Sequence, residues 1–521
     1  MPSYLSPGVY MEEVDRGSKP IESVGTAVAA FIGYTEKATD VKNGQQVSVV
    51  GKPTLVTNWS QYVQKFGGFI KGAYLPDSVY GYFANGGSIA YIVSLKTLGE
   101  ADPESSTAAK TVINSDDAKP AKLLELAAKK SGPGGNNIEV DIKTTKPEGD
   151  DKKAGPATFT LTIKENGSVK ETFPDLTTGK GDNNVQTVLE TKSQLLVATV
   201  VGKAELAPAS GSFALSGGAV EEKAITLKDY QGSTIDRTGF GGLEAFDDVT
   251  MLAAPDLMTA YEAGEIDKKG VQAVQQAMID YCELVRYCFA ILDPLPNLMP
   301  QEVKEWRLEV NYDSTRAALY YPWIETADQI GGAGRTRRVP PSGHMAGVYA
   351  RVDGTRGVHK APANETIRTV LGLGVQVTKG EQDLLNPIGV NCIRSFPGRG
   401  IRIWGARTLS SDASWRYINV RRLFNMIEES IERGTQWVVF EPNDAMLWGR
   451  VTRDITAFLT MVWRTGALFG ATPDKAFYVK CDAETNPKEA RDLGQLVAEI
   501  GISPTKPAEF VIFRISQWSG D

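Results

Sequence analysis

An apolar run near the C-terminal end of the printed sequence places the strongest constraint on this chain. Residues 509–518 read EFVIFRISQW, and such β-branched and aromatic side chains are typical of a β-strand. An exposed apolar strand is a template for pairing with another chain. The run must therefore be buried in its own domain or pair with a second molecule. A second short strand is predicted at GVYMEEV (8–14), within an extended N-terminal segment that contains several prolines.

Between these two ends, the first half of the chain changes sharply in composition. Residues 21–95 contain a buried-strand pattern at AVAAFIGYT (27–35), and a helix followed by a strand at 78–95. Residues 96–222 are rich in Lys, Asp, Thr, Ser and Gly, and carry alternating apolar runs on either side of an Asn-Gly pair at 166–167. Asn-Gly between alternating runs is a strong hairpin signal. We interpret this block as a β-rich domain inserted into a larger fold.

The second half of the chain alternates between strand and helix patterns. In residues 225–385, the buried-strand patterns CFAIL (288–292) and AALYYPWI (317–324) follow helical ones, which predicts an α/β domain with a mostly parallel sheet. Residues 388–505 contain two amphipathic helices, then a third helix and a proline-rich linker. The apolar stripes of the two amphipathic helices are Val420, Phe424, Ile427 and Ile431, and Val451, Ile455, Phe458 and Val462. We expect both stripes to face a core, and the charged faces to face away from it.

These patterns divide the chain into six parts. They are an N-terminal arm (1–20), a first core segment (21–95), the β-rich insert (96–222), the α/β domain (225–385), a C-terminal domain (388–505) and a C-terminal strand arm (506–521).

Composition excludes several classes of protein. The 56 Lys and Arg against 63 Asp and Glu give a net charge of −7, which argues against a general nucleic-acid binder. No apolar run approaches the ~20 residues that cross a bilayer, and the N-terminus has no pattern of a secretory signal. The four cysteines form no CxxC pair and favour a reducing compartment. We expect synthesis and assembly in the cytoplasm.

The sequence also lacks the motifs that mark catalytic, metal-binding or nucleotide-binding sites. The two histidines, His344 and His359, stand in no metal-ligand spacing, and no GxSxG nucleophile motif is present. The stretch GGAGRTRRVPPSG (331–343) lacks the lysine of a phosphate-binding loop, and Cys282 and Cys288 fall in a buried pattern. We therefore predict no catalytic residue, no cofactor and no metal. Two alternatives stay open: a hydrolase or nucleotide-binding enzyme on the α/β region, and a monomeric binding module whose terminal strand is paired internally.

Longer stretches carry a family resemblance that spans both ends and most of the second half. They include YLSPGVYMEEV (4–14), GTAVAAFIGYT (25–35), PPSGHMAGVYARVDGTRGVHKAPAN (340–364), GVNCIRSFPGRGIRIWGARTL (389–409) and PAEFVIF (507–513). In these stretches the chain closely resembles the contractile tail sheath family, found in contractile phages, R-type tailocins and extracellular contractile injection systems. The block at 96–222 matches poorly in detail.

The resemblance implies a multidomain α/β fold. It consists of a conserved α+β sheath core, a subtilisin-like α/β domain without a catalytic triad, and an inserted β-rich outer domain. It also implies that the two terminal arms exchange strands with neighbouring subunits and complete a small sheet in their C-terminal domains. The inter-subunit strand residues would be Val9, Tyr10, Met11, Val14, Phe510, Val511, Ile512, Phe513 and Ile515.

The function implied is that of a structural subunit. Such a subunit polymerises helically around an inner tube, in stacked rings with six-fold symmetry, and contracts to drive the tube through a target membrane. Its partners would be further copies of itself, the inner tube protein, and the baseplate and tail terminator or cap proteins, with no direct contact to nucleic acid and no insertion into a membrane. The particle is a phage tail or a phage-tail-like particle released by lysis, and the sequence does not separate these cases.

The inner tube would face the C-terminal domain. Residues 390–470 hold eleven Arg against seven Asp and Glu, so this region is locally basic. We hypothesise a basic inner surface that slides on an acidic tube, with Arg421, Arg422, Arg450 and Arg453 as candidate contacts. The alternative is that these arginines belong to a solvated helix face.

Overall fold

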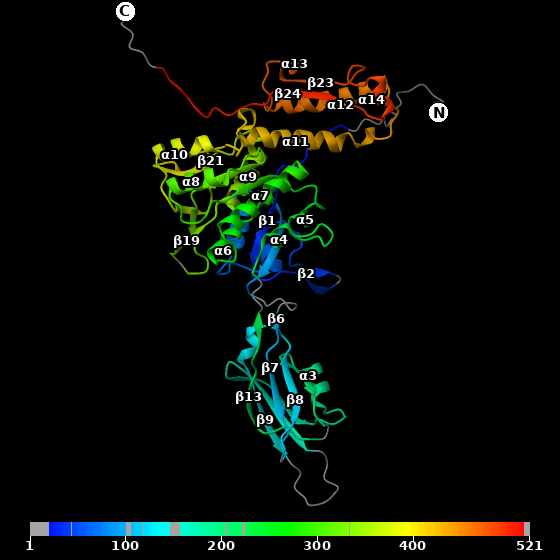
Figure 1. Ribbon diagram of the computed structural model, residues 1–521, viewed down its shortest axis with the longest axis vertical. Helices are drawn as coiled ribbons and strands as arrows, with labels where there is room; N and C mark the ends of the chain where they lie inside the picture. The colour runs from blue at the N-terminus through cyan, green and yellow to red at the C-terminus, as the bar shows by residue number, and fades with distance from the viewer. Residues whose placement is uncertain are drawn as a thin grey trace, which may run out of the picture. The chain divides into compact units, whose positions relative to one another are not determined.

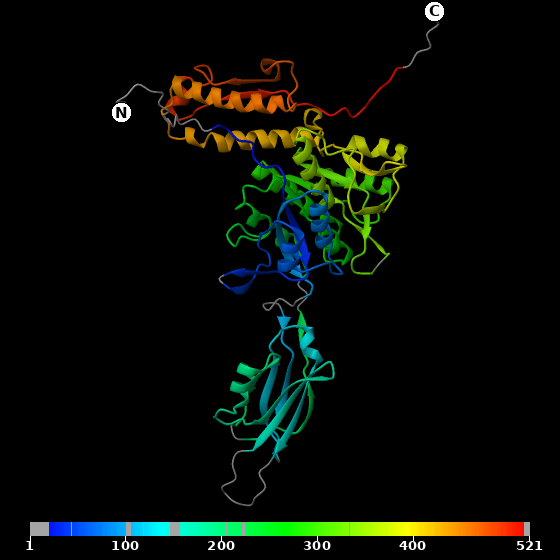
Figure 2. The same cartoon turned by 180° about the vertical axis from the view of Figure 1, so that it is seen from behind.

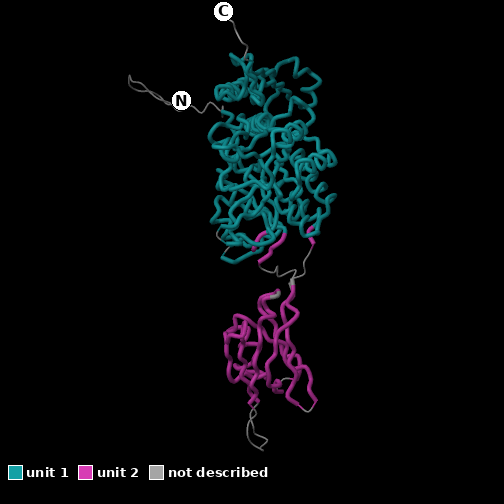
Figure 3. The backbone as a smooth tube through the Cα atoms, turned by 90° about the vertical axis from the view of Figure 1, so that its left-hand side faces the viewer, with its two compact units in different colours: residues 1–34, 39–95, 226–521 teal, residues 35–38, 96–225 magenta. Residues whose placement is uncertain are grey.

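The chain was analysed as a computed structural model, drawn in Figure 1 and seen from behind in Figure 2. The structure describes residues 20–42, 44–99, 106–117, 119–145, 157–203, 206–220, 224–332 and 334–514. The chain divides into two compact units (Figure 3). Unit 1 comprises residues 1–34, 39–95 and 226–521, and unit 2 comprises residues 35–38 and 96–225.

An eight-stranded sheet forms the centre of unit 1. Its strand order is β22-β21-β17-β16-β15-β1-β5-β4. The strands are β1 (Val28–Thr35), β4 (Thr54–Val56), β5 (Ile89–Thr97), β15 (Met251–Ala253), β16 (Phe289–Leu292), β17 (Ala317–Tyr321), β21 (Val390–Phe396) and β22 (Gly400–Ile403). The middle five, from β21 to β1, run parallel, and β4 and β22 each pair antiparallel with a neighbour.

The composition of these strands follows from their burial. Every residue of β1, β15, β16 and β17 is buried, as expected for parallel strands with both faces covered. The strand patterns at 27–35 and 288–292 are confirmed. The pattern at 317–324 is confirmed only as far as Tyr321, because Ile324 begins a strand of another sheet. The sheet also draws strands from three of the predicted parts, because β1 and β5 lie before the insert and β21 lies beyond residue 388. The parallel sheet is therefore not confined to the expected α/β domain at 225–385. That range also holds a separate three-stranded antiparallel sheet of β18 (Ile324–Ala327), β19 (Thr336–Val339) and β20 (Val370–Leu373).

Helices cover the sheet. They include α1 (Trp59–Phe66), α2 (Leu75–Asn85), α7 (Lys268–Val285), α8 (Pro300–Val310) and α9 (Ser342–Arg356). Helix α2 packs closely on α9, because a Cβ on Gly347 would lie 2.5 Å from the Tyr82 carbonyl oxygen. His344 is buried in the same contact, and burial lowers its pKa to about 4.

A layer of two long helices completes unit 1. Helix α11 (Ile418–Gly434) and helix α12 (Ala445–Arg464) pack through Leu423, Ile427, Val451 and Ile455, with the small sheet of β23 (Phe477–Lys480) and β24 (Glu499–Ile502) in the same core. Figures 1 and 2 show α11 between α12 and the rest of the unit. The predicted third helix is reduced to α14 (Lys488–Asp492), and the sequence patterns missed β24.

The described part of unit 2 is mainly β-structure, with one short α-helix and a 3-10 turn at Pro133–Asn137. A four-stranded sheet has the order β11-β10-β9-β13, and a three-stranded sheet has the order β12-β8-β7. The strands are β7 (Lys110–Asn114), β8 (Lys122–Ala128), β9 (Ile138–Thr145), β10 (Thr158–Glu165), β11 (Ser168–Leu176), β12 (Leu196–Val200) and β13 (Gly211–Ala214), and the helix is α3 (Val185–Lys192).

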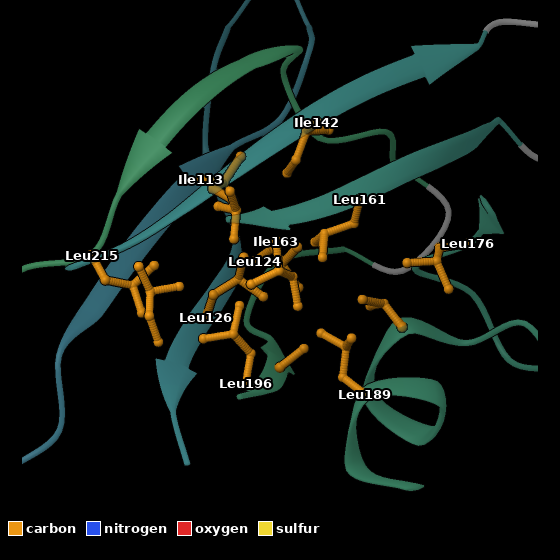
Figure 4. Packing of buried hydrophobic residues seen from close by; sticks show 14 of the residues in the cluster. Ile113, Leu124, Leu126, Ile142, Leu161, Ile163, Leu176, Leu189, Leu196 and Leu215 are labelled. Carbon is orange, nitrogen blue, oxygen red and sulfur yellow. The ribbon is translucent and has the colours of Figure 1, made fainter. Parts of the chain in front are cut away.

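The two sheets of unit 2 share one core. Ile113 and Leu124 of one sheet pack in the same cluster as Ile142, Leu161 and Ile163 of the other (Figure 4). The predicted hairpin is confirmed: Asn166 and Gly167, with φ of 51° and 76°, form the turn between β10 and β11.

Among the described residues, no helix is long and apolar enough to span a bilayer.

Candidate assembly surface

The C-terminal segment is the first candidate for contact with another molecule. Residues 510–514 form no helix or strand, and Phe510, Val511, Ile512 and Phe513 are 68% to 83% exposed. In Figures 1 and 2 this red segment runs away from the body of unit 1. The predicted strand therefore has no partner strand within the described chain. Ile515 and the N-terminal candidates Val9, Tyr10, Met11 and Val14 lie outside the described residues.

A single carboxylate anchors the root of this segment. Glu509 accepts hydrogen bonds from the Arg407 guanidinium through both oxygens, at 2.9 and 2.8 Å. It also accepts from the Asn386 amide at 2.8 Å and from the Tyr417 hydroxyl at 2.9 Å. Two-pronged arginine–carboxylate bonds are among the strongest in proteins. The position of Glu509 is therefore fixed, and the four apolar residues begin immediately after it.

The charge state of Glu509 follows from this setting. Partial burial by itself raises the pKa of the carboxyl group, but the hydrogen bonds from Arg407, Asn386 and Tyr417 outweigh burial and hold the pKa below its ordinary value. Glu509 is thus ionised at neutral pH. We name Glu509, Arg407, Asn386 and Tyr417 the Glu509 clamp.

The N-terminal arm has its root at the other end of α11. Ile21 crosses the last turn of that helix so closely that a Cβ on Gly434 would lie 2.7 Å from its Cγ1. The Val24 N–H donates to the Ser430 hydroxyl at 3.1 Å in the same stretch. The Glu509 clamp, by contrast, includes Tyr417 at the start of α11. At 1.5 Å per residue, the 17 residues of α11 separate the two roots by roughly 25 Å.

Two of the four arginines expected to face an inner tube are buried. Arg421 is 5% exposed; its guanidinium lies over the Trp415 ring at 4.4 Å, donates to the Asn425 side chain at 2.8 Å and pairs with Glu428 at 2.9 Å. Both expectations for this residue, a tube contact and a solvated face, require an exposed side chain, so both are wrong for Arg421.

The expectation of an exposed side chain is also wrong for Arg422. It is 5% exposed and pairs with Asp353 of α9 at 2.6 Å, while also donating to the Thr26 carbonyl at 2.8 Å. Its guanidinium lies over the Tyr349 ring at 4.8 Å. This arginine joins α11 to α9 and to the chain that leads into β1, and is not available to a partner.

Arg450 and Arg453 of α12 are accessible. Arg450 lies over the Trp437 ring at 4.2 Å and 3.8 Å from Glu441, with a side chain that is 39% exposed. Arg453 is more exposed and contacts Asp454 at 3.1 Å. These two remain candidates for a polar contact surface.

The sheet of β23 and β24 is a second candidate. It has two strands in the described chain, and two-stranded sheets are marginal without further pairing or packing. One side packs in the core of the helical layer through Phe477 and Ile502, while Tyr478 on the opposite side is exposed. The sheet is therefore suited to accept further strands.

Exposed apolar side chains concentrate in the same region. Of the 27 large hydrophobic side chains exposed in the described residues, 13 lie between Val439 and Phe513. Large contiguous apolar surfaces are uncommon on proteins that act alone and mark contact sites.

The sequence patterns missed the Glu509 clamp, because its four residues are spread from 386 to 509. The sole local signal was a charged residue at the start of an apolar run.

Two sequence models of known families match the second half of the chain. Residues 242–409 match the phage tail sheath protein central domain, and residues 410–517 match the phage tail sheath C-terminal domain. Together they run from 242 to 517 without a gap, which is more than half of the 521 residues.

Individual relatives agree with these matches. The tail sheath protein of Vibrio phage KVP40 is 31% identical over 191 residues, which are 36% of this chain and 28% of its own length. The tail sheath protein of Burkholderia phage BcepMu is 25% identical over 97% of this chain and 95% of its own length. For the first three curated relatives, the matched region spans 28%, 63% and 43% of their own length.

Solved structures show the same fold. The helical sheath of the anti-feeding prophage in its contracted state matches with a TM-score of 0.58 at 23% identity, covering 98% of this chain and 99% of its own. The sheath of an extracellular contractile injection system, also contracted, matches with a TM-score of 0.56 at 24% identity, covering 100% and 99%. The mixed α/β multidomain fold is therefore that of these sheath structures.

Proposed function

The chain belongs to the family of phage tail sheath proteins, and from this membership we propose that it is a structural subunit of a contractile sheath. Its named relatives are structural sheath proteins and not enzymes. In the proposed function, copies of the chain polymerise helically as stacked six-fold rings around an inner tube. On contraction, the sheath drives that tube through a target membrane.

The main support for this proposal is the exposed apolar segment 510–513, which follows the Glu509 clamp in the sequence. An extended segment of this kind can add as a strand to the edge of another subunit's sheet. Each main-chain hydrogen bond gained contributes about 1 kcal/mol net, and burial of the four side chains adds to it. We propose the sheet of β23 and β24 of a neighbouring copy as the acceptor, joined there by the N-terminal arm of a third copy.

The positions of the two roots support a lattice. Because the N-terminal root lies at the end of α11 and the C-terminal root at its start, the two arms are attached at opposite ends of one helix. Arms that leave at separate places engage different neighbours, and a contact that is not self-complementary builds rings or helical filaments. Arms whose ends stay paired would keep subunits linked while the rigid bodies rearrange.

We take the parallel-sheet region as the subtilisin-like domain of the family, without its triad. Ser342, the serine nearest to His344 in sequence, donates its hydroxyl to the buried Asp293 at 2.5 Å. His344 instead contacts the Thr369 hydroxyl at 3.1 Å and is fully buried. This arrangement supports a rigid scaffold and disfavours the hydrolase alternative.

The nucleotide-binding alternative is disfavoured on similar grounds. Of the arginines in the loop at 331–338, Arg337 pairs with Asp77 at 3.0 Å and Arg338 pairs with Glu325 at 3.1 Å. Both guanidinium groups are thereby neutralised by carboxylates of this chain. The exposed C-terminal segment likewise disfavours a monomeric module whose terminal strand is paired internally.

The remaining partners follow from the proposed particle. We propose that Arg450 and Arg453 contact the inner tube, and that the ends of the sheath contact baseplate and terminator or cap proteins. The solved structures that match this chain include the baseplate of the anti-feeding prophage. Assembly would take place in the cytoplasm, and the finished phage tail or tail-like particle would be released by lysis.

Removal of the C-terminal arm tests the proposal. A chain truncated after Glu509 keeps the Glu509 clamp but loses the apolar segment, and we expect it to melt at the same temperature as the full chain while forming no tubes or rings in negative-stain electron microscopy. The exposed substitution Lys506→Ser, placed before the clamp, serves as control and should assemble normally. Tubes of ordinary length and stability from the truncated chain would rule out the proposed strand exchange.

A further inference from the structure

We infer that the turn between α11 and α12 presents an apolar tip that inserts into a second copy of this chain. The tip consists of Val439, Phe440, Met446 and Leu493, all of them exposed. The inference rests on the proposed function, because it concerns a contact between sheath subunits. It adds a side-chain contact that is separate from the two exchanged arms.

Phe440 is the most unusual residue of the tip. Its ring is fully exposed, and its backbone has a φ of 67°. Residues other than glycine rarely adopt this left-handed conformation, and those that do are most often Asn or Asp. An aromatic residue in a strained conformation that buries nothing gains no stability within a single chain. Strain of this kind is commonly retained where it serves a contact.

The turn around Phe440 is well ordered. The Glu441 N–H donates to the Val438 carbonyl at 3.1 Å, and Asn443 donates to the Gln495 carbonyl at 2.8 Å. The same asparagine accepts from the Trp448 indole N–H at 2.7 Å. The ring is therefore held outward by a fixed scaffold, and its exposure is not the result of a loose loop.

The tip resembles the centre of an interface. Asn443 links the turn to Gln495, two residues beyond Leu493, so apolar side chains come from both segments. An aromatic anchor with apolar neighbours is the usual composition of the centre of a protein–protein contact.

The location of the tip points to a second copy as its occupant. The described chain enters the helical layer at this end, where Ile21 packs on Gly434, six residues before Phe440. The N-terminal arm is therefore attached at this end of α11, and under the proposed strand exchange a second copy is linked to the end that carries the tip. A tube that slides during contraction would have to release every buried phenylalanine, whereas copies of the sheath stay linked.

Two substitutions of Phe440 separate folding from assembly. Phe440→Gly removes the ring and relieves the left-handed strain, so we expect an unchanged or higher melting temperature for the subunit. Both Phe440→Gly and Phe440→Ser should raise the concentration needed for tube assembly by at least about tenfold, the effect of losing one buried aromatic side chain per contact. Ile235→Ser, at an exposed apolar position of unit 1 outside the helical layer, should change neither quantity.

Photo-crosslinking identifies the occupant. With p-benzoylphenylalanine at position 440 in assembled, tube-filled particles, we expect a product of twice the 56.4 kDa subunit mass. A product with the tube protein alone, or no product, overturns the inference. Normal assembly of both Phe440 variants also overturns it, and leaves the proposed function standing. If neither the unchanged chain nor Ile235→Ser forms tubes, the proposed function itself fails, and this inference fails with it.

Discussion

At the scale of single residues, the Glu509 carboxylate is the group on which we expect assembly to depend most. Glu509 fixes the point from which the apolar segment 510–513 departs, through four hydrogen bonds to residues that are distant in sequence. The Arg407 side chain is only 10% exposed, and Glu509 supplies the counter-charge to its guanidinium. The clamp therefore stabilises the subunit and also directs the arm.

Substitution of Glu509 by alanine should reveal both roles. We expect a loss of about 1–3 kcal/mol in the free energy of unfolding, because Arg407 would remain buried with no counter-charge. Tube assembly should also weaken, because the root of the arm is no longer fixed. Denaturant unfolding and sedimentation of assembled tubes measure the two effects. The control Glu484→Ala removes only an exposed pair with Lys480 and should stay within about 0.5 kcal/mol.

The pH dependence of this loss has a definite sign. Because the folded-state pKa of Glu509 is depressed, its stabilising contribution is fully present above the ordinary glutamate pKa and is lost as the pH falls through the depressed value. The difference in unfolding free energy between the unchanged chain and Glu509→Ala should therefore shrink in acid. An equal difference at pH 7 and pH 3 would contradict the ionised clamp.

At the scale of elements, α11 is buried on two sides. One side packs on α12 through Leu423 and Ile427, and the other contacts the body of unit 1 through Arg422. The Arg422–Asp353 pair is nearly inaccessible, with side chains 5% and 6% exposed. A helix held on both sides is a suitable rigid rod from which to mount two arms.

The contrast between Arg422 and Arg453 tests this account of the helical layer. Arg422→Ala should destabilise the subunit by about 3–5 kcal/mol, because it leaves the Asp353 carboxylate buried without its partner. Arg453→Ala, whose side chain is 61% exposed, should cost no more than about 0.5 kcal/mol. Denaturant unfolding of both variants measures the two losses in the free energy of unfolding. Equal stability of the two would mean that Arg422 is not part of the core.

At the scale of the whole molecule, the chain combines two units with separate cores. Among the residues that the structure describes, the core of unit 2 consists of 18 buried residues between Ala109 and Leu215, none of which belongs to unit 1. Two sheets sharing such a core are expected to fold without the remainder of the chain.

Residues 106–220, produced alone, should therefore fold. We expect a β-type circular dichroism spectrum and cooperative thermal unfolding. Ile163→Asp places a charge in the core and should abolish folding, whereas Thr162→Asp, one position away on the opposite face, should be tolerated. A fragment that shows no cooperative transition would mean that unit 2 depends on unit 1.

Local patterns in the sequence were sufficient for many elements. The buried runs of β1, β16 and β17, the helix α7 and the hairpin of β10 and β11 all lie where the periodicity predicts. These elements depend on side-chain spacing within a few residues and on the residue types in the turns. Both can be read directly from the sequence.

The tertiary structure decided what those elements contact. The parallel sheet combines strands from before and after the insert, and no local sequence pattern predicts this strand order. The charged side of α11 suggests exposure, yet Asp353, 69 residues earlier, supplies the counter-charge that allows Arg422 to be buried. The sequence by itself determined that residues 509–518 form an apolar run with the composition of a strand. Only the fold decided that residues 510–514 pair with no strand of the described chain, because the edges of its sheets and the Glu509 clamp are assembled from residues far apart along the chain.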